Sequence, residues 1–257
     1  MKSFLRSRWQ LIVILLFSPY VCACEPAKDS SYPPLAVDGG FIMFHAVAVL
    51  EDEGKPNPDM GIGISFLNCA NGVKDFIARL PYVADPGEVQ DAFIADSANS
   101  KGELFIVHSA PIRAFTGISY GSDYFSVMVF RREENTYSLD KDLTEYLGSG
   151  ADVVDHEGDV DVPIYIYPYK TRAAVISRLK SRSYLEWANK AVRDLTVIDK
   201  AKIYSSMSVA NSTKMYLIKG DKVKPEEVSA GWVSILYVTA KGKEIRGWVL
   251  CEKVDGC

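Results

Sequence analysis

The chain has 257 residues, a formal net charge of −4, 48% hydrophobic residues and 24% charged residues. This composition is typical of a globular protein and excludes a chain that is disordered beyond its termini. The charge is unevenly distributed: residues 24–163 carry 9 Lys and Arg against 24 Asp and Glu, whereas residues 164–257 carry 17 against 9. Such an asymmetry is compatible with a polyanionic partner and equally with two halves that face each other. Nucleic acid is not among the partners that we expect.

The first 23 residues have the pattern of a secretory signal peptide. Three basic residues precede an apolar run over 11–17, and a short segment of small residues ends at Ala23. This predicts cleavage between Ala23 and Cys24. The apolar run is far shorter than the roughly 20 residues that span a bilayer, and no later segment is longer. We therefore expect an exported protein of the periplasm or cell envelope.

Cys24 allows two interpretations. Residues 21–24 resemble the lipobox of bacterial lipoproteins, with an unusual Cys at its second position, and a lipid on Cys24 is the only membrane attachment that we expect. Ordinary cleavage would instead leave Cys24, Cys69, Cys251 and Cys257, which could form two disulfides in an oxidising compartment. Cys251 and Cys257 lie six residues apart at the end of the last predicted strand. Their pairing is the one that the spacing favours.

Residues 24–40 contain Pro and Gly in a pattern that predicts an extended tether. Short segments rich in Val, Ile, Phe and Tyr follow, separated by Gly, Pro, Asn or Asp, and predict a β-rich N-terminal domain over residues 41–170. The segments 99–102 and 131–135 fit hairpin loops, which favours an antiparallel arrangement. Residues 124–130 are apolar on both faces, as in a strand that is covered on both sides. The predicted strands are 41–50, 61–67, 92–95, 104–108, 124–130 and 164–167.

Few helices are expected. Residues 73–80 and 139–146 each predict a short helix that ends at a following Pro or Gly. The clearest helical periodicity covers residues 183–195, and a further turn is expected within 171–180. Together these last two segments predict a helical connector over residues 171–198. The expected fold is therefore mainly β, with two β-rich units joined by a helical segment.

The C-terminal residues 199–257 predict a small β-barrel, because five short strands follow one another within about fifty residues. A strand and turn at 215–221 precede two Gly-Trp pairs, at 231–232 and 247–248. These elements, in this order, resemble a bacterial SH3 domain over residues 199–254. No family is recognised for residues 41–165. The predicted strands of this unit are 201–204, 215–218, 221–224, 231–237 and 247–250.

The resemblance implies a module that holds an envelope protein on cell-wall peptides, through a groove of aromatic and polar side chains. Trp232 and Trp248 could instead support the barrel, because a domain of this size needs its large side chains buried. Tyr204 and the loop at 205–214 are better placed for recognition, since exposed loops on a rigid scaffold usually carry it. The aromatic candidates for the groove are Tyr204, Tyr216, Trp232, Tyr237 and Trp248.

A second set of aromatic candidates lies at the end of the predicted N-terminal domain. Tyr165, Tyr167 and Tyr169 alternate along the chain, so that they share one face of an extended strand. They stand beside basic residues and could form a contact surface, in which Tyr and Arg are often energetically dominant. The same pattern equally fits the inner face of a sheet.

Residues with catalytic chemistry are sparse. The three histidines, including His108, have no zinc-site spacing, so that no metal and no cofactor are expected. A nucleophile at Cys69 or Ser109 with His108 lacks the flanking motifs of the known hydrolases. The acidic segment 150–162 allows a calcium loop, a solvated loop or a segment that docks on the basic residues 170–193.

We therefore expect a non-enzymatic, exported bacterial envelope protein that recognises a cell-wall peptide or a protein partner. One alternative is a periplasmic immunity or inhibitor protein whose acidic first domain neutralises a basic toxin or hydrolase. A second alternative is a cell-wall hydrolase, which would need a pocket that unites Cys69 or Ser109 with His108 and a carboxylate.

Overall fold

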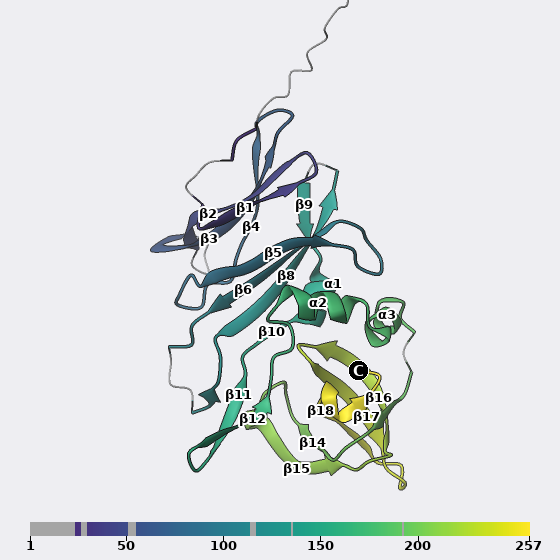
Figure 1. The fold of residues 1–257 in the computed structure, drawn as a ribbon. Coiled ribbons are helices and arrows are strands. Elements are labelled where there is room, and N and C mark those ends of the chain that lie inside the picture. The colour runs from purple at the N-terminus through teal and green to yellow at the C-terminus, as the bar shows by residue number, and fades with distance from the viewer. Residues whose placement is uncertain (1–23, 27–29, 51–54, 114–116, 135, 192) are drawn as a thin grey trace, which may run out of the picture.

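The computed structural model describes residues 24–26, 30–50, 55–113, 117–134, 136–191 and 193–257 (Figure 1). The predicted signal peptide, with Ala23 at its end, lies outside these residues. The described chain is mainly β, as predicted, with strands in several antiparallel sheets and three α-helices. None of these helices is long and apolar enough to cross a membrane.

The first layer is a four-stranded antiparallel sheet in the order β1-β2-β3-β4. Its first strand falls within the segment that the sequence predicted as a tether: residues 32–37 pair with β2, because their apolar side chains pack onto the same core. Residues 74–79, predicted as a helix, form a strand that pairs with β3. The strands are β1 (Tyr32–Val37), β2 (Gly40–Leu50), β3 (Pro56–Asn68) and β4 (Lys74–Arg79).

The second layer is a five-stranded sheet in the order β10-β8-β6-β5, with β9 paired to β8. The predicted hairpin loop at 99–102 lies between the antiparallel strands β5 and β6. Residues 131–133 of the predicted loop 131–135 instead belong to β8 and pair with β9, so that this strand is longer than predicted. A core of Ile, Leu, Phe and Val side chains joins this sheet to the first one. The strands are β5 (Glu88–Ala95), β6 (Glu103–Ala110), β8 (Tyr124–Glu133), β9 (Thr136–Leu139) and β10 (Ser149–Gly150).

Strand β6 is buried along its whole length, because both faces of the five-stranded sheet are covered. Three helices lie on the face opposite the first sheet: α1 (Lys141–Leu147), α2 (Arg172–Leu179) and α3 (Arg182–Ala188). Asp140, Thr171 and Ser181 cap their N-termini with side-chain oxygens. The periodic segment 183–195 is only partly helical, since α3 ends at Ala188 and Leu195 begins a strand.

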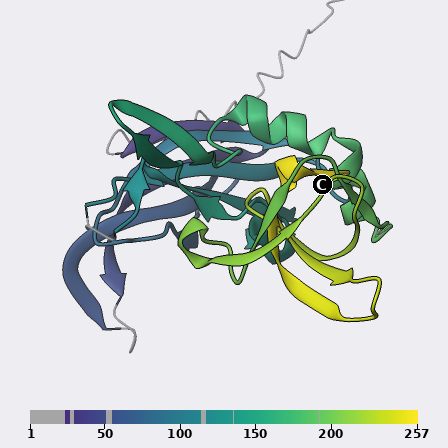
Figure 2. The same ribbon diagram turned by 90° about the horizontal axis from the view of Figure 1, so that it is seen from below.

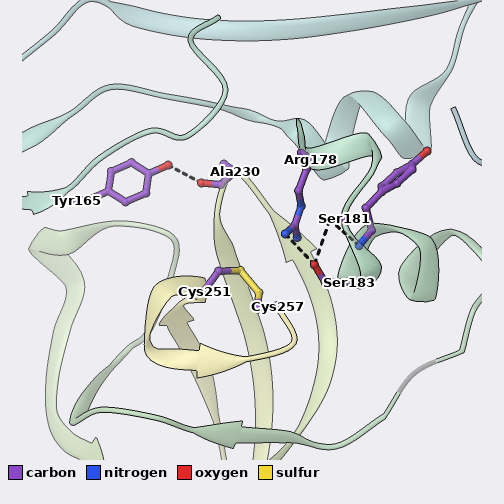
Figure 3. Close-up of a disulfide and its surroundings, with 8 residues drawn as sticks. Tyr165, Arg178, Ser181, Ser183, Ala230, Cys251 and Cys257 are labelled. Atoms are coloured by element: carbon purple, nitrogen blue, oxygen red, sulfur yellow. Dashed lines mark hydrogen bonds between the residues drawn. A yellow bond between two sulfur atoms is a disulfide. The ribbon is translucent and has the colours of Figure 1, made fainter. Parts of the chain in front are cut away.

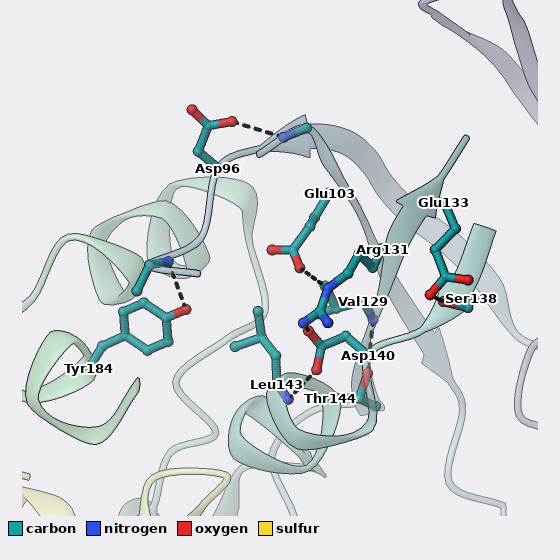
Figure 4. Close-up of polar contacts among 12 residues, drawn as sticks. Asp96, Glu103, Val129, Arg131, Glu133, Ser138, Asp140, Leu143, Thr144 and Tyr184 are labelled. Carbon is teal, nitrogen blue, oxygen red and sulfur yellow. Dashed lines mark hydrogen bonds and ion pairs between the residues drawn. The ribbon is translucent and has the colours of Figure 1, made fainter. Parts of the chain in front are cut away.

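Helix α1 is fixed to the five-stranded sheet by polar contacts at its first turn (Figure 4). The Val129 amide donates to Thr144 Oγ1 at 3.0 Å, and the Leu143 amide donates to the capping Asp140 at 3.0 Å. Arg131 forms an ion pair with Asp140, and its Nε lies 3.6 Å from Oε1 of the fully buried Glu103. These contacts set the direction in which the C-terminal end of α1 points.

A small three-stranded sheet, in the order β12-β11-β7, projects beside the second layer. It consists of β7 (Ser119–Tyr120), β11 (Val153–Glu157) and β12 (Val160–Tyr165). The hairpin of β11 and β12 carries most of the acidic segment that the sequence singled out. One carboxylate of that segment docks on the basic region, because Asp152 forms an ion pair with Lys170, whereas Asp155, Asp159 and Asp161 are exposed.

The C-terminal residues form a strongly curved seven-stranded sheet in the order β15-β14-β18-β17-β16-β13-β19, called the C-terminal sheet below (Figure 2). It has its own apolar core, which includes Ile203, Val233, Ile235 and Val249. Two short 3₁₀ helices lie at Val209–Asn211 and Cys251–Lys253. The strands are β13 (Leu195–Val197), β14 (Ala201–Tyr204), β15 (Ser212–Leu217), β16 (Lys222–Ser229), β17 (Trp232–Val238), β18 (Glu244–Leu250) and β19 (Val254–Asp255).

Candidate functional site

Five of the eight aromatic residues singled out by the sequence lie in a single buried core. This core also contains residues of the five-stranded sheet and of the three helices. It therefore joins the two N-terminal layers with their helices, called the first unit below, to the C-terminal sheet. Tyr165, Tyr167 and Tyr169 are therefore buried and do not form an exposed contact surface. They do not share the face of one strand either, because β12 ends at Tyr165. The five residues are Tyr165, Tyr167, Tyr169, Tyr204 and Trp232.

Trp232 lies at the centre of this joint. Its ring centroid is 5.3 Å from that of Tyr165 and 5.1 Å from that of Tyr204, which packs edge-on. The hydroxyl of Tyr165 donates a hydrogen bond to the carbonyl of Ala230, which begins the turn before Trp232 (Figure 3). Aromatic pairs of this geometry add to the energy of burial. Trp232 thus anchors the C-terminal sheet on the first unit.

The hydroxyl of Tyr167 likewise bonds to groups within the protein. It donates to the carbonyl oxygens of Leu147 and Gly148, at 3.2 and 2.8 Å, where helix α1 ends. Burial raises the pKa of Tyr167 well above its ordinary value, because the charged phenolate would be poorly solvated there. The group remains a neutral donor and holds the end of the helix.

The other three aromatic candidates lie apart from this core or at its margin. Tyr216 is 56% exposed, and the Lys200 ammonium lies 4.6 Å from its ring centroid. Tyr237 is half-buried, and its hydroxyl donates to Asp221 at 3.3 Å. Trp248 is half-buried and packs against the core. The eight candidates do not form one groove.

The turn between β16 and β17 docks on the C-terminal end of α1. Ser229 Oγ donates to the carbonyl of Glu145, and the Ala230 amide donates to the carbonyl of Tyr146 at 3.1 Å. The last carbonyls of a helix have no intrahelical partner, so that the C-terminal sheet supplies what the helix lacks. Ala230 and Gly231 both have positive φ, as a two-residue hairpin turn of type I′ requires.

A cavity of about 590 Å³ lies beside this contact, between the five-stranded sheet and the C-terminal sheet. Its volume is within the range of pockets that hold small ligands. Aromatic side chains from both units form part of its wall: Tyr120 and Tyr124 come from the first unit, and Trp232 comes from the C-terminal sheet. Tyr165 completes this aromatic wall. Residues of both units thus line this cavity.

Part of the loop that the sequence marked for recognition reaches this cavity. Met207, Ser208 and Val209 follow Tyr204 and line one side of it. Met207 is 44% exposed, and a flexible thioether of this kind adapts to irregular ligand surfaces. The prediction that this loop binds a ligand stays a prediction, but its position beside the cavity is compatible with that role.

The polar lining of the cavity was not predicted. Glu145 and Glu227 are its only charged residues within the described chain, and both are exposed. Ser126 also lines it and is 8% exposed, and its hydroxyl is not among the buried side-chain atoms that lack a partner. These three residues come from α1, β16 and β8, so that no local sequence pattern connects them.

The described residues do not form the catalytic arrangements of Cys69 or Ser109 with His108 that the sequence analysis considered. Cys69 is bonded to Cys24, and His108 Nε2 contacts the Pro86 carbonyl at 2.9 Å. Burial lowers the pKa of His108. Ser109 Oγ accepts a hydrogen bond from Gln90 instead of from the histidine. The described residues also contain no cluster of three or more His, Cys, Asp or Glu that could hold a metal ion.

The cysteines form two pairs at disulfide distance. Cys251 and Cys257 pair as the spacing favoured, with Cα atoms 5.1 Å apart (Figure 3). Cys24 pairs with Cys69 at a Cα distance of 5.3 Å. The first pair closes the end of the C-terminal sheet, and the second attaches the chain near its predicted mature start to the turn between β3 and β4.

Comparison with known proteins gives no match: no protein-family model, no curated protein and no solved structure is significantly similar to this chain.

Proposed function

We propose that the protein is an exported cell-envelope binding protein that holds a cell-wall peptide in the cavity between the five-stranded sheet and the C-terminal sheet. The observation that carries this proposal is the cavity itself, with aromatic side chains from two units and a volume of about 590 Å³. Such sites bury most of a small ligand and orient it with a few polar groups.

The C-terminal sheet contributes the module that the sequence resemblance implies. We propose that it acts as an SH3-type domain whose recognition surface includes the loop with Met207 and is completed by the first unit, while the buried Trp232 holds the two together. Two disulfide pairs and the absence of a membrane-crossing helix among the described residues are compatible with an exported protein.

A pull-down on purified peptidoglycan tests this function. The mature chain is expected to be retained, and Met207→Trp is expected to reduce retention because the larger ring would fill part of the cavity. Met215→Trp is the matched control, since Met215 is a second exposed methionine of the C-terminal sheet that does not line this cavity. Absence of retention, or equal retention by the two variants, would contradict the proposal.

One observation favours the alternative of an inhibitor or immunity protein. The hairpin of β11 and β12 exposes Asp155, Asp159 and Asp161 beside Val160 and Val162, of which Val160 is 63% exposed. An acidic surface with an apolar strip suits a basic protein partner. In the same pull-down from envelope extract, one protein that is captured at low salt and lost at high salt, without retention on peptidoglycan, would establish this alternative.

A further inference from the structure

The charged residues of the described chain that line the cavity between the five-stranded sheet and the C-terminal sheet are all negative. Glu145 and Glu227 line it, and no Lys, Arg or His of the described residues does. Neither carboxylate forms an ion pair within the described chain. Two carboxylates without a protein counter-ion beside a low-dielectric wall attract a cation more strongly than they would in open solvent.

The wall of the cavity suits the same kind of ligand. Tyr120 and Tyr124 of this wall are half-buried and exposed, respectively, whereas Tyr165 and Trp232 are almost fully buried and pack on each other. The faces of aromatic rings carry partial negative charge and attract ammonium groups. The hydroxyl of Tyr124 is held by Ser149 Oγ at 2.9 Å, so that this ring is fixed before a ligand arrives. The aromatic wall and the two carboxylates therefore both favour a positively charged ligand.

Ser126 adds a polar group to the wall of the cavity. The residue is 8% exposed, and its hydroxyl is not among the buried side-chain atoms that lack a partner. A hydroxyl at the wall of an open cavity bonds water until a ligand group replaces that water. A hydroxyl both donates and accepts, so that a ligand N–H or carbonyl in the cavity would satisfy it.

We infer that the cavity selects a peptide through a protonated amine, held between Glu145 and Glu227 against the aromatic wall, with Ser126 bonding the adjoining peptide group. This inference rests on the proposed function and specifies its ligand: the peptide carries a free amine and binds less well when that amine is acylated.

Titration calorimetry on the mature chain tests the inference with two probes. The first is Ala-Lys-Ala with blocked termini, and the second is the same peptide with its lysine amine acetylated. The first probe is expected to bind and the second to bind at least about fivefold more weakly, as the loss of ion pairs of this exposure implies. The variant Glu145→Gln/Glu227→Gln is expected to abolish the difference between the probes.

A matched control separates the cavity from the overall charge of the protein. Asp142→Asn/Asp255→Asn changes the net charge equally, on the same helix and in the same C-terminal sheet, at exposed residues that do not line this cavity. It is expected to bind the lysine probe as the parent does. Equal weakening by both variants, unchanged binding by both, or no binding of the lysine probe to the parent would overturn the inference.

The outcomes distinguish this inference from the function on which it rests. Retention on peptidoglycan that survives Glu145→Gln/Glu227→Gln and acetylation of the wall amines would leave the proposed function standing and contradict the amine selectivity. Binding of the lysine probe that depends on both glutamates, without retention on peptidoglycan, would support the amine site and contradict the wall-binding function.

Discussion

The backbone amide of Ala230 donates a hydrogen bond to the carbonyl of Tyr146, at an N–O distance of 3.1 Å. Tyr146 is the next-to-last residue of α1 in the first unit, whereas Ala230 lies in a turn of the C-terminal sheet 84 residues later. Through this bond, and through the neighbouring bond from Ser229 to Glu145, the helix end is completed by a distant part of the chain. The joint also positions the two glutamates that line the cavity.

Gly148 permits this close approach, and its replacement is expected to loosen the joint. The residue has φ +60°, and a Cβ there would lie 2.8 Å from Ser229 Oγ and 2.9 Å from Ala230 Cβ. Gly148→Ala should therefore reduce the free energy of unfolding by about 2–3 kcal/mol, as measured by chemical denaturation.

Gly158→Ala is the control for a positive φ without a nearby contact. Gly148 also has ψ −153°, outside the left-handed helical region, so that part of its larger loss is backbone strain. Gly158 also has positive φ, at +67°, but nothing lies within 4 Å of its added Cβ. It is expected to cost about 1 kcal/mol, which is the strain of the left-handed conformation alone. Equal losses in the two variants would show that the contact with the C-terminal sheet contributes nothing.

Ser126 and Ser229 are expected to respond to replacement to different extents, although both are buried. Ser229→Ala removes the donor to the Glu145 carbonyl and should destabilise the protein by about 1–2 kcal/mol. Ser126→Ala removes a hydroxyl at the cavity wall that is not among the buried atoms lacking a partner, so that it should change the stability by no more than about 0.5 kcal/mol. Thermal and chemical denaturation measure both effects. Equal losses of stability in the two variants would contradict the contribution of the Ser229 hydrogen bond.

Much of the fold could be predicted from local pattern, because alternation and turn residues are local signals. The strand at 124–130, apolar on both faces, lies in a sheet that is covered on both sides. The helix expected over 139–146 exists as α1. Local pattern did not predict residues 73–80 correctly. A short amphipathic segment fits a helix and a strand equally well, and here the pairing with β3 makes residues 74–79 a strand.

The candidate site could be predicted only in part. Tyr165 and Trp232 were marked as aromatic candidates, but a sequence does not show that they pack on each other across two units. Glu145, Glu227 and Ser126 carry no local motif. They line one cavity because the C-terminal sheet docks on α1, which is a tertiary contact between distant segments.

Glu103 is expected to make stability depend on pH. Burial raises the pKa of this carboxyl above its ordinary 4.5, and the nearby Arg131 opposes the shift without cancelling it. The folded state therefore keeps the proton in a pH range where the unfolded chain has lost it. Accordingly, the contribution of Glu103 to the free energy of unfolding falls as pH rises from about the ordinary pKa through the raised one.

Glu103→Gln removes this dependence, so that the variant should gain stability relative to the parent as pH rises through that window. Denaturant unfolding at a series of pH values measures the difference. Glu133→Gln, at an exposed position on β8, is the control and should run parallel to the parent. A difference between Glu103→Gln and the parent that stays constant with pH would contradict the shift.

The sulfur of Cys24 is expected to carry a disulfide and no lipid, because one Sγ cannot form both bonds. Intact-mass analysis of the exported protein should give the mass of residues 24–257 without an acyl group, and four cysteines should become alkylable only after reduction. In Cys69→Ser, one thiol should react before reduction. A diacylglyceryl mass on Cys24 would exclude its pairing with Cys69.

The most direct test of a peptide site between the two units is hydrogen exchange of the mature chain, with and without soluble peptidoglycan fragments. The account predicts slower exchange in β8 and β10 and at residues 207–209, all of which contribute to the cavity lining. Protection confined to the surface around Tyr216 and Lys200, or to the hairpin of β11 and β12, would contradict it. So would unchanged exchange throughout the chain at saturating fragment concentration.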